Sequence, residues 1–132
     1  MLAVVFPLGP ERYALPVEGV REIVAAPALT SLPTAPAVVL GLVNLRGDVL
    51  PVFDTGRLVA SPYSAEPQFV MVVETDRGAA GVAASGLPSI LELDPALDSD
   101  RTLWSGSMHS IDGEPVVMLD VTALLKRSLA ES

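Results

Sequence analysis

The sequence predicts a mainly β fold that ends in a short helix. Short runs of β-branched residues alternate with turn residues about every eight to twelve positions, which is typical of barrels and sandwiches. The two halves of the chain also repeat a common pattern. The 132 residues contain no long linker or low-complexity tract, so we expect a single domain over residues 1–132.

The expected strands are apolar or β-branched runs bounded by glycine, proline or aspartate. They cover residues 2–8, 12–16, 19–24, 40–46, 49–53, 68–75, 79–84, 87–93, 103–110 and 115–119. The polar residues 55–67 and 94–102 are expected to be connections. After Asp120, three leucines at helical spacing predict the C-terminal helix. Asp54 and Asp120 each end a strand, where an aspartate can cap the helix that follows.

The segment 23–45 contains no charge and is as long as the ~20 apolar residues of a membrane helix. Pro27, Pro33 and Pro36 lie inside it, and helices do not propagate through prolines at that density. We therefore expect a loop that leads into a strand, and no insertion into a membrane. The N-terminus has no positively charged region before its apolar run, which argues against a signal peptide.

An internal repeat predicts that the chain arose by duplication. Residues 47–58 and 113–124 share a glycine, an acid, an apolar run, an aspartate seven positions after the glycine and a leucine four positions later. At the same offset of 66 positions, residues 4–6 align with the apolar residues 70–72. We expect two similar subdomains, approximately residues 1–66 and 67–132.

The composition excludes several classes of function. Sixteen acidic residues against eight basic ones give a net charge of −8, which argues against binding nucleic acid or anionic membranes. The absence of cysteine excludes disulfides, thiolate metal sites and cysteine catalysis, and it fits a reducing compartment such as the cytoplasm. A hydrophobic content of 50% predicts apolar surface that is available to protein partners.

The motif "VFDTGRL" resembles the surroundings of an aspartic protease carboxylate at Asp54. Such an enzyme needs two carboxylates that share a proton. The repeat aligns Asp120 with Asp54, but the glycine of the motif is missing after Asp120. A retroviral-type homodimer is therefore the arrangement that could supply a second copy of the motif. The cation of Arg57 would oppose proton sharing. We favour a strand end, and keep the protease as an unfavoured alternative.

No other catalytic, metal or cofactor site is predicted. His109 is the only histidine, and it has neither cysteine nor a second histidine with which to bind a metal. A Ser-His-Asp triad is compositionally possible, but no nucleophile elbow of the form G-x-S-x-G is present. We therefore expect a protein that is not an enzyme.

Arg46 is the strongest candidate for a binding residue. It follows the apolar run "GLVNL" and stands immediately before the turn residues Gly47 and Asp48, with "VLPVF" beyond them. A guanidinium offers five donors in a rigid fork, and an arginine rimmed by apolar surface is a common composition of interaction hot spots. The pattern predicts a hairpin that presents Arg46 to a partner.

The chain resembles the CheW family of coupling proteins in bacterial chemotaxis. The resemblance rests on "RYALPVEGVREIV", "LTSLPTAPAVVLGLVNLRGDVLPVFD", the strand pair from Gly81 to Ile90, "LWSG" and "GEPVVMLDVTALL". It implies the CheW-like fold, in which two five-stranded β-barrels of Src-homology-3-like form pack on a shared hydrophobic core.

The resemblance also implies a function. Members of the family are non-catalytic adaptors that link the cytoplasmic hairpin tips of chemoreceptors to the regulatory domain of a CheA-type histidine kinase. The receptor tip is expected to lie between the two barrels. The implied receptor-binding residues are Val20, Glu22, Ile23, Gly41, Arg46, Leu87 and Ile90.

The second half departs from the family pattern. Ala84 and Ser85 stand where many members carry valine and aspartate, and Pro88 is expected to interrupt the following strand. Contacts with the kinase depend on this half in the inferred arrangement. A specialised coupler that binds the receptor but has lost full kinase binding is therefore an alternative.

Overall fold

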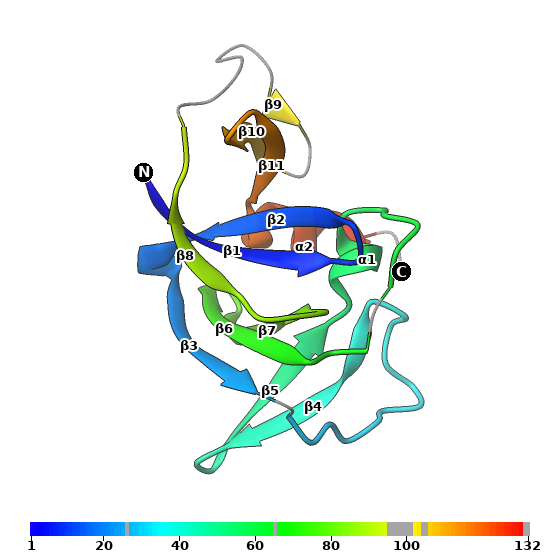
Figure 1. The fold of residues 1–132 in the computed structure, drawn as a ribbon. Coiled ribbons are helices and arrows are strands. Elements are labelled where there is room, and N and C mark those ends of the chain that lie inside the picture. The colour runs from blue at the N-terminus through cyan, green and yellow to red at the C-terminus, as the bar shows by residue number, and fades with distance from the viewer. Residues whose placement is uncertain (26, 65, 95–101, 104–105, 131–132) are drawn as a thin grey trace.

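The computed structural model describes residues 1–25, 27–64, 66–94, 102–103 and 106–130, and it confirms a mainly β fold with a C-terminal helix (Figure 1). The strands are β1 (Leu2–Leu8), β2 (Glu11–Pro16), β3 (Val20–Ala25), β4 (Val39–Leu45), β5 (Asp48–Phe53), β6 (Phe69–Thr75), β7 (Gly78–Ala84), β8 (Ser89–Glu92), β9 (Thr102–Leu103), β10 (Gly106–Ile111) and β11 (Glu114–Leu119). The helices are the 3-10 turn η1 (Val17–Gly19), α1 (Thr55–Leu58) and α2 (Val121–Ala130).

The strands form two sheets. A five-stranded sheet has the order β3-β6-β7-β5-β4, and a six-stranded sheet has the order β8-β1-β2-β11-β10-β9, in which β9 has only two residues. Within the described residues β3 and β4 are not hydrogen-bonded neighbours, so the five-stranded sheet stays open at the point where a barrel would close. Apart from the additional two-residue strand β9, the expected pair of five-stranded units is present, but as open sheets.

Each sheet contains strands from both halves of the chain. β6 and β7 join β3, β4 and β5, while β1 and β2 join the strands that follow residue 88. Each sheet joins the halves twice, once by an antiparallel pairing (β3 with β6, β1 with β8) and once by a parallel pairing (β5 with β7, β2 with β11). Corresponding strands of the repeat occupy corresponding places in the two sheets. The division near residue 66 therefore describes the repeat in the sequence, and not the membership of the sheets.

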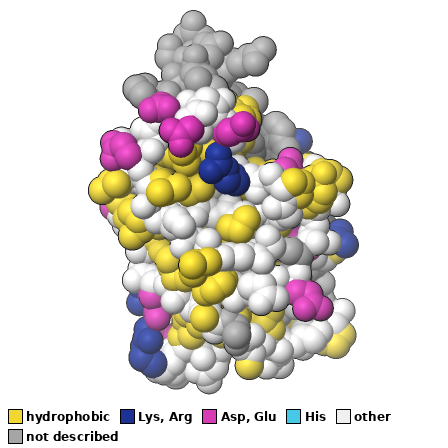
Figure 2. Space-filling model, in the orientation of Figure 1, with side chains coloured by type: hydrophobic (Ala, Val, Ile, Leu, Met, Phe, Trp, Pro, Cys, Tyr) yellow, Lys and Arg dark blue, Asp and Glu magenta, His cyan; other side chains and the backbone are white. Residues whose placement is uncertain are grey.

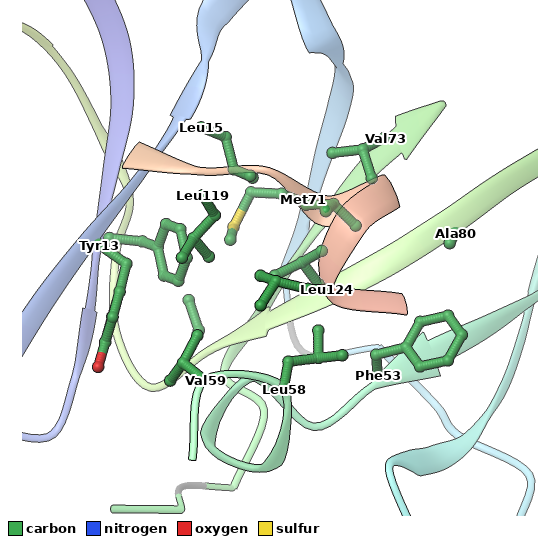
Figure 3. Packing of buried hydrophobic residues seen from close by; sticks show 14 of the residues in the cluster. Tyr13, Leu15, Phe53, Leu58, Val59, Met71, Val73, Ala80, Leu119 and Leu124 are labelled. Atoms are coloured by element: carbon green, nitrogen blue, oxygen red, sulfur yellow. The ribbon is translucent and has the colours of Figure 1, made fainter. Parts of the chain in front are cut away.

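The largest hydrophobic cluster lies between the sheets and under both α-helices (Figure 3). We call it the shared core; its buried residues are Val4, Phe6, Leu8, Tyr13, Leu15, Val38, Phe53, Leu58, Val59, Met71, Val73, Ala80, Val82, Ala84, Leu119, Val121, Leu124 and Leu125. Successive residues of β1 alternate between the shared core and a second cluster that contains Ala3 and Val5. β6 alternates in the same way between the shared core and a third cluster. Both strands are buried on two faces, which explains their unbroken apolar sequences.

Asp54 and Asp120 directly precede the two α-helices, but only Asp120 caps its helix with its side chain. The Asp120 carboxylate accepts a hydrogen bond from the Ala123 N–H at 3.1 Å. The Asp54 side chain makes no capping hydrogen bond, and its Oδ2 lies 3.7 Å from Nε of Arg57 instead. The expected side-chain cap at Asp54 is therefore wrong, because this carboxylate is turned toward Arg57.

Two other expectations shift in their boundaries. The strand expected at 19–24 is preceded by the 3-10 turn η1 and runs from Val20 to Ala25. The strand expected at 87–93 is shorter, and the strand expected at 103–110 corresponds to β9 and β10, with residues 104 and 105 outside the described residues. The sequence "LWSG" thus lies partly outside the described chain.

Candidate binding site at the sheet edges

The β4–β5 hairpin ends in a tight turn with Arg46 at its tip. Leu45 pairs with Asp48, so Arg46 and Gly47 are the two turn residues. Both have positive φ, 52° and 92°, as a type I′ turn requires. This conformation suits glycine but is uncommon for arginine, because a Cβ atom crowds the backbone there. The side-chain oxygen of Asn44 accepts a hydrogen bond from the Gly47 N–H at 3.0 Å.

The Arg46 guanidinium forms a two-pronged ion pair with Glu22. Nη2 binds Oε1, and Nη1 lies 3.3 Å from Oε2. Glu22 belongs to β3 and Arg46 follows β4, and these strands are the opposite edges of the five-stranded sheet. The ion pair therefore connects the two edges where the sheet is open. The Arg46 side chain is 73% exposed, so the pair lies at the surface.

This ion pair affects the titration of both groups. Hydrogen bonds from Arg46 are the main cause that lowers the pKa of the Glu22 carboxyl. The same hydrogen bonds raise the pKa of the Arg46 guanidinium. Both groups are charged at neutral pH. Glu22 engages only the two Nη atoms of Arg46, which leaves further N–H donors of the guanidinium for an acceptor on another molecule.

Apolar side chains are exposed on both edge strands β3 and β8. Ile23 pairs with Met71 of β6, and Ile90 pairs with Val4 of β1. Met71 and Val4 belong to the shared core. Because directly paired residues project from the same face of a sheet, Ile23 and Ile90 lie on the faces that look toward the shared core. Ile23 is 41% exposed and Ile90 is 60% exposed.

The other apolar residues of the predicted site lie on or next to the same two edge strands. Val20 is half buried against the shared core, while Leu87 is 70% exposed just before β8. Leu91 pairs with Ala3 of the second cluster, so it projects from the face of β8 opposite to Ile90. Together with Leu87 it lines a hollow beside β1. Figure 2 has the orientation of Figure 1, and it shows hydrophobic side chains gathered on the side of the molecule where β8 lies. Leu2 and Leu91 are also exposed apolar residues. They were not among the predicted binding residues, although both lie in expected strands, a position that could have indicated them.

Gly41 is buried and differs from the other six predicted residues in its role. Thr30 and Leu42 exchange two backbone hydrogen bonds of 2.8 Å, which bring the preceding loop over β4. A Cβ atom at Gly41 would lie 2.7 Å from the Thr30 carbonyl oxygen. The residue therefore permits the loop to pack closely over β4.

A sequence profile described as the CheW-like domain matches residues 2–129. The chain belongs to the CheW-like domain family. Two relatives extend over most of it. "Probable chemotaxis protein CheW" of Rhizobium etli is 27% identical over 139 residues, covering 98% of this chain and 90% of that protein. "Chemotaxis protein CheW" of Rhizobium meliloti is 27% identical over 133 residues, covering 92% and 84%.

A solved structure shows the same fold. The scaffolding protein TtCheW from Thermoanaerobacter tengcongensis matches with a TM-score of 0.78 at 22% sequence identity, covering 93% of this chain and 90% of that chain. The arrangement of the two sheets and the short C-terminal helix is thus that of a CheW protein, as the resemblance implied.

In this CheW-like chain the "DTG" motif has structural contacts. The Thr55 hydroxyl donates a hydrogen bond to the backbone carbonyl of Ala83. A Cβ atom at Gly56 would lie 2.2 Å from the Tyr63 carbonyl oxygen, so only glycine lets the following loop approach so closely. Asp54 itself is buried at the end of β5. These contacts give Thr55 and Gly56 structural roles in the fold.

His109 is buried in the six-stranded sheet. One ring nitrogen, Nδ1, lies 3.0 Å from the Asp94 carbonyl oxygen, and Nε2 lies 2.9 Å from the Ser107 hydroxyl. The carbonyl can only accept, which assigns the proton to Nδ1 in the neutral ring and makes the hydroxyl the donor to Nε2. Both nitrogens of the histidine are thus satisfied inside the fold.

The residues that depart from the CheW family pattern lie within the fold. Ala84 is buried at the end of β7. The Ser85 hydroxyl donates to the Pro7 carbonyl and accepts from the Gly9 N–H, both at 3.1 Å. Pro88 precedes β8 and does not interrupt it, contrary to our expectation, because a proline just before a strand removes no ladder hydrogen bond.

The described residues contain neither a cluster of side chains that could hold a metal ion nor a membrane-spanning helix. Among the residues that the structure describes, no group of three or more histidine, aspartate and glutamate side chains is arranged to hold a metal ion. Within the same described ranges, no helix has the length and apolar character needed to cross a membrane.

Proposed function

We propose that this chain is a non-catalytic adaptor that couples the cytoplasmic hairpin tips of chemoreceptors to a CheA-type histidine kinase. The observation that carries the proposal is the match to the CheW-like family over residues 2–129. The names of its relatives support a role in chemotaxis, and the similar solved structure, which is that of a scaffolding protein, supports a scaffolding role. Both partners are cytoplasmic, so the cytoplasm is the proposed location.

The apolar edges β3 and β8 are the proposed receptor-binding surface. A receptor tip is a pair of antiparallel helices, and such helices bind by inserting apolar side chains between apolar side chains of the partner. Ile23, Leu87 and Ile90 are exposed in the free chain, and burying apolar area gives association its main driving force. Val20 lies at the start of β3, where it continues the same surface.

Arg46 and Glu22 are the proposed polar part of this surface. Their ion pair fixes the direction of the guanidinium, so the donors that Glu22 does not use are oriented before a partner arrives. An oriented donor set favours one position of a carboxylate or carbonyl acceptor over neighbouring positions. The polar pair thus sets the register of binding, while the apolar residues supply most of the affinity.

The proposal includes no reaction. Support comes from Asp54, whose neighbours Thr55 and Gly56 have structural contacts, and from Arg57, whose cation lies 3.7 Å from the Asp54 carboxylate. An aspartic protease needs a carboxylate that shares a proton, and an adjacent cation opposes such sharing.

Kinase coupling is tested with both partners in one experiment. The purified chain is titrated by calorimetry with a receptor cytoplasmic fragment and, separately, with the regulatory domain of a CheA-type kinase. Saturable binding of both supports a full coupler, and binding of the receptor fragment alone supports the receptor-only alternative. Binding of neither partner contradicts the proposal. Acid-dependent peptide cleavage that is lost in Asp54→Asn would support the protease instead.

A further inference from the structure

The two hairpin tips of the repeat have the same backbone conformation but different residues. Arg46 and Gly47 have φ values of 52° and 92°, and Asp112 and Gly113 have values of 51° and 82°. Each pair connects two antiparallel strands through a two-residue turn. Aspartate tolerates the left-handed region well, whereas arginine has no short side chain with which to stabilise it locally. The first tip therefore carries the less favourable residue.

The first tip has an additional hydrogen bond that compensates for this choice. Asn44 accepts from the Gly47 N–H at 3.0 Å and so holds the turn from its side chain. The corresponding residue of the second hairpin is Ser110, whose hydroxyl lies 3.3 Å from Asp94 and does not hold a turn. Asn44 is exposed, and water could satisfy the Gly47 N–H in its absence. The Asn44–Gly47 hydrogen bond therefore matters mainly because it holds the turn in one conformation.

The direction of the guanidinium depends on this conformation. Arg46 reaches Glu22 with two nitrogen atoms, and Glu22 lies on β3 at the far edge of the five-stranded sheet. A two-pronged contact requires the tip to stay in one conformation, since a change in φ at Arg46 would swing its side chain away from β3.

We propose that Asn44 is a positioning residue of the receptor-binding site: it holds the left-handed turn that keeps Arg46 on Glu22, with its remaining donors oriented toward an acceptor of the receptor. The inference rests on the proposed function for the identity of the partner. Its mechanism within the free chain does not depend on that function. Asn44 acts through Arg46 and makes no contact with the partner itself.

The first test uses the free protein. Nuclear magnetic resonance measures amide hydrogen exchange at Gly47 and the titration of the Glu22 carboxyl. We expect faster Gly47 exchange in Asn44→Ala, together with a Glu22 pKa that moves back toward its ordinary value. Asn44→Asp keeps the acceptor oxygen and should keep Gly47 protected. Ser110→Ala, the matched control in the second hairpin, should leave both quantities unchanged.

The second test is a double-mutant cycle for binding of a receptor cytoplasmic fragment. Asn44→Ala should weaken binding about three- to tenfold through lost pre-organisation, and it should have no additional effect when Arg46→Ala is already present. An equal loss in both backgrounds would contradict the inference, as would an unchanged Glu22 titration in Asn44→Ala. If the wild-type chain does not bind the fragment, the proposed function fails, and the measurements on the free protein still decide the role of Asn44.

Discussion

Ile23 and Ile90 occupy equivalent places on the edge strands of two different sheets. Each pairs with a residue of the shared core, Met71 for Ile23 and Val4 for Ile90, and each remains substantially exposed. Leu87 precedes Ile90 by three positions, as Val20 precedes Ile23. The repeat thus produces two apolar edges of similar composition on one protein. A partner with two apolar faces, such as a helical hairpin, could contact both edges.

The first prediction concerns these isoleucines. Ile23→Ser and Ile90→Ser should each weaken binding of a receptor tip fragment about tenfold or more, because apolar anchors dominate interfaces of this kind. Thermal unfolding should change little, since both side chains are already partly exposed. Leu32→Ser is a matched control, because Leu32 is also 41% exposed but lies in the loop before β4. Equal effects of all three variants would show that the loss is not specific to the edges.

The second prediction concerns the charge at the hairpin tip. Arg46→Ala should leave the folded structure intact and weaken receptor binding about tenfold or more. Arg46→Lys should restore little, because an ammonium cannot reproduce a planar two-pronged contact. Binding curves and melting curves of the same samples separate the two effects. Wild-type affinity in a folded Arg46→Ala protein would remove Arg46 from the site.

The third prediction concerns alkaline pH. Burial, a hydrogen bond of 3.0 Å to Glu11 and the charge of Glu11 raise the pKa of Tyr13 to about 12. The folded state thus favours the neutral phenol. This contribution to the free energy of unfolding is fully present below the ordinary tyrosine pKa of about 10 and is lost as the pH rises through about 12. Chemical denaturation at a series of alkaline pH values measures the loss.

Tyr13→Phe is the control for this dependence. The variant cannot ionise at this position, so its free energy of unfolding should vary less with pH in the same window. The ultraviolet absorbance of tyrosinate should also lose the component that titrates at the higher pH. An identical alkaline profile in the variant and the wild type would contradict the assignment.

The fourth prediction concerns close packing after α1. Gly56→Ala should destabilise the protein by about 1–3 kcal/mol, because the added methyl group would overlap the Tyr63 carbonyl. Gly19→Ala meets open space and should change stability by less than about 1 kcal/mol. Denaturant unfolding compares the two directly. Equal stability of both variants would show that the loop over Gly56 can move without cost.

The sequence predicted the types of the elements well, because each type has a local cause. The strand β11 begins and ends 66 positions after β5, which is the offset of the repeat. Alternation of turns and β-branched residues was sufficient for these strands. The sharing of strands between the two sheets could not be predicted in the same way. The four pairings that join the halves, β3–β6, β5–β7, β1–β8 and β2–β11, connect residues far apart in the chain.

The candidate site was predicted in part, and the missing parts are tertiary. Arg46 was indicated by its place at a hairpin, but its ion pair with Glu22 depends on the curling of the sheet. The burial of Gly41 depends on the loop that carries Thr30. Asp54 fits the N-cap pattern, but its carboxylate lies beside the Arg57 guanidinium and makes no capping hydrogen bond to α1. The first two relationships have no signal in local spacing, whereas Asp54 and Arg57 are three positions apart, and the sequence already indicated their interaction.

The proposed function requires that β3, β8 and the tip of the β4–β5 hairpin together bind a receptor hairpin. A nuclear magnetic resonance titration of the isotope-labelled chain with a receptor cytoplasmic tip fragment follows this binding residue by residue. We expect the largest shift changes at Ile23, Ile90 and Arg46, with little change along β10 and β11. Changes confined to β10 and β11, or no saturable change at any residue, would contradict the proposed binding surface.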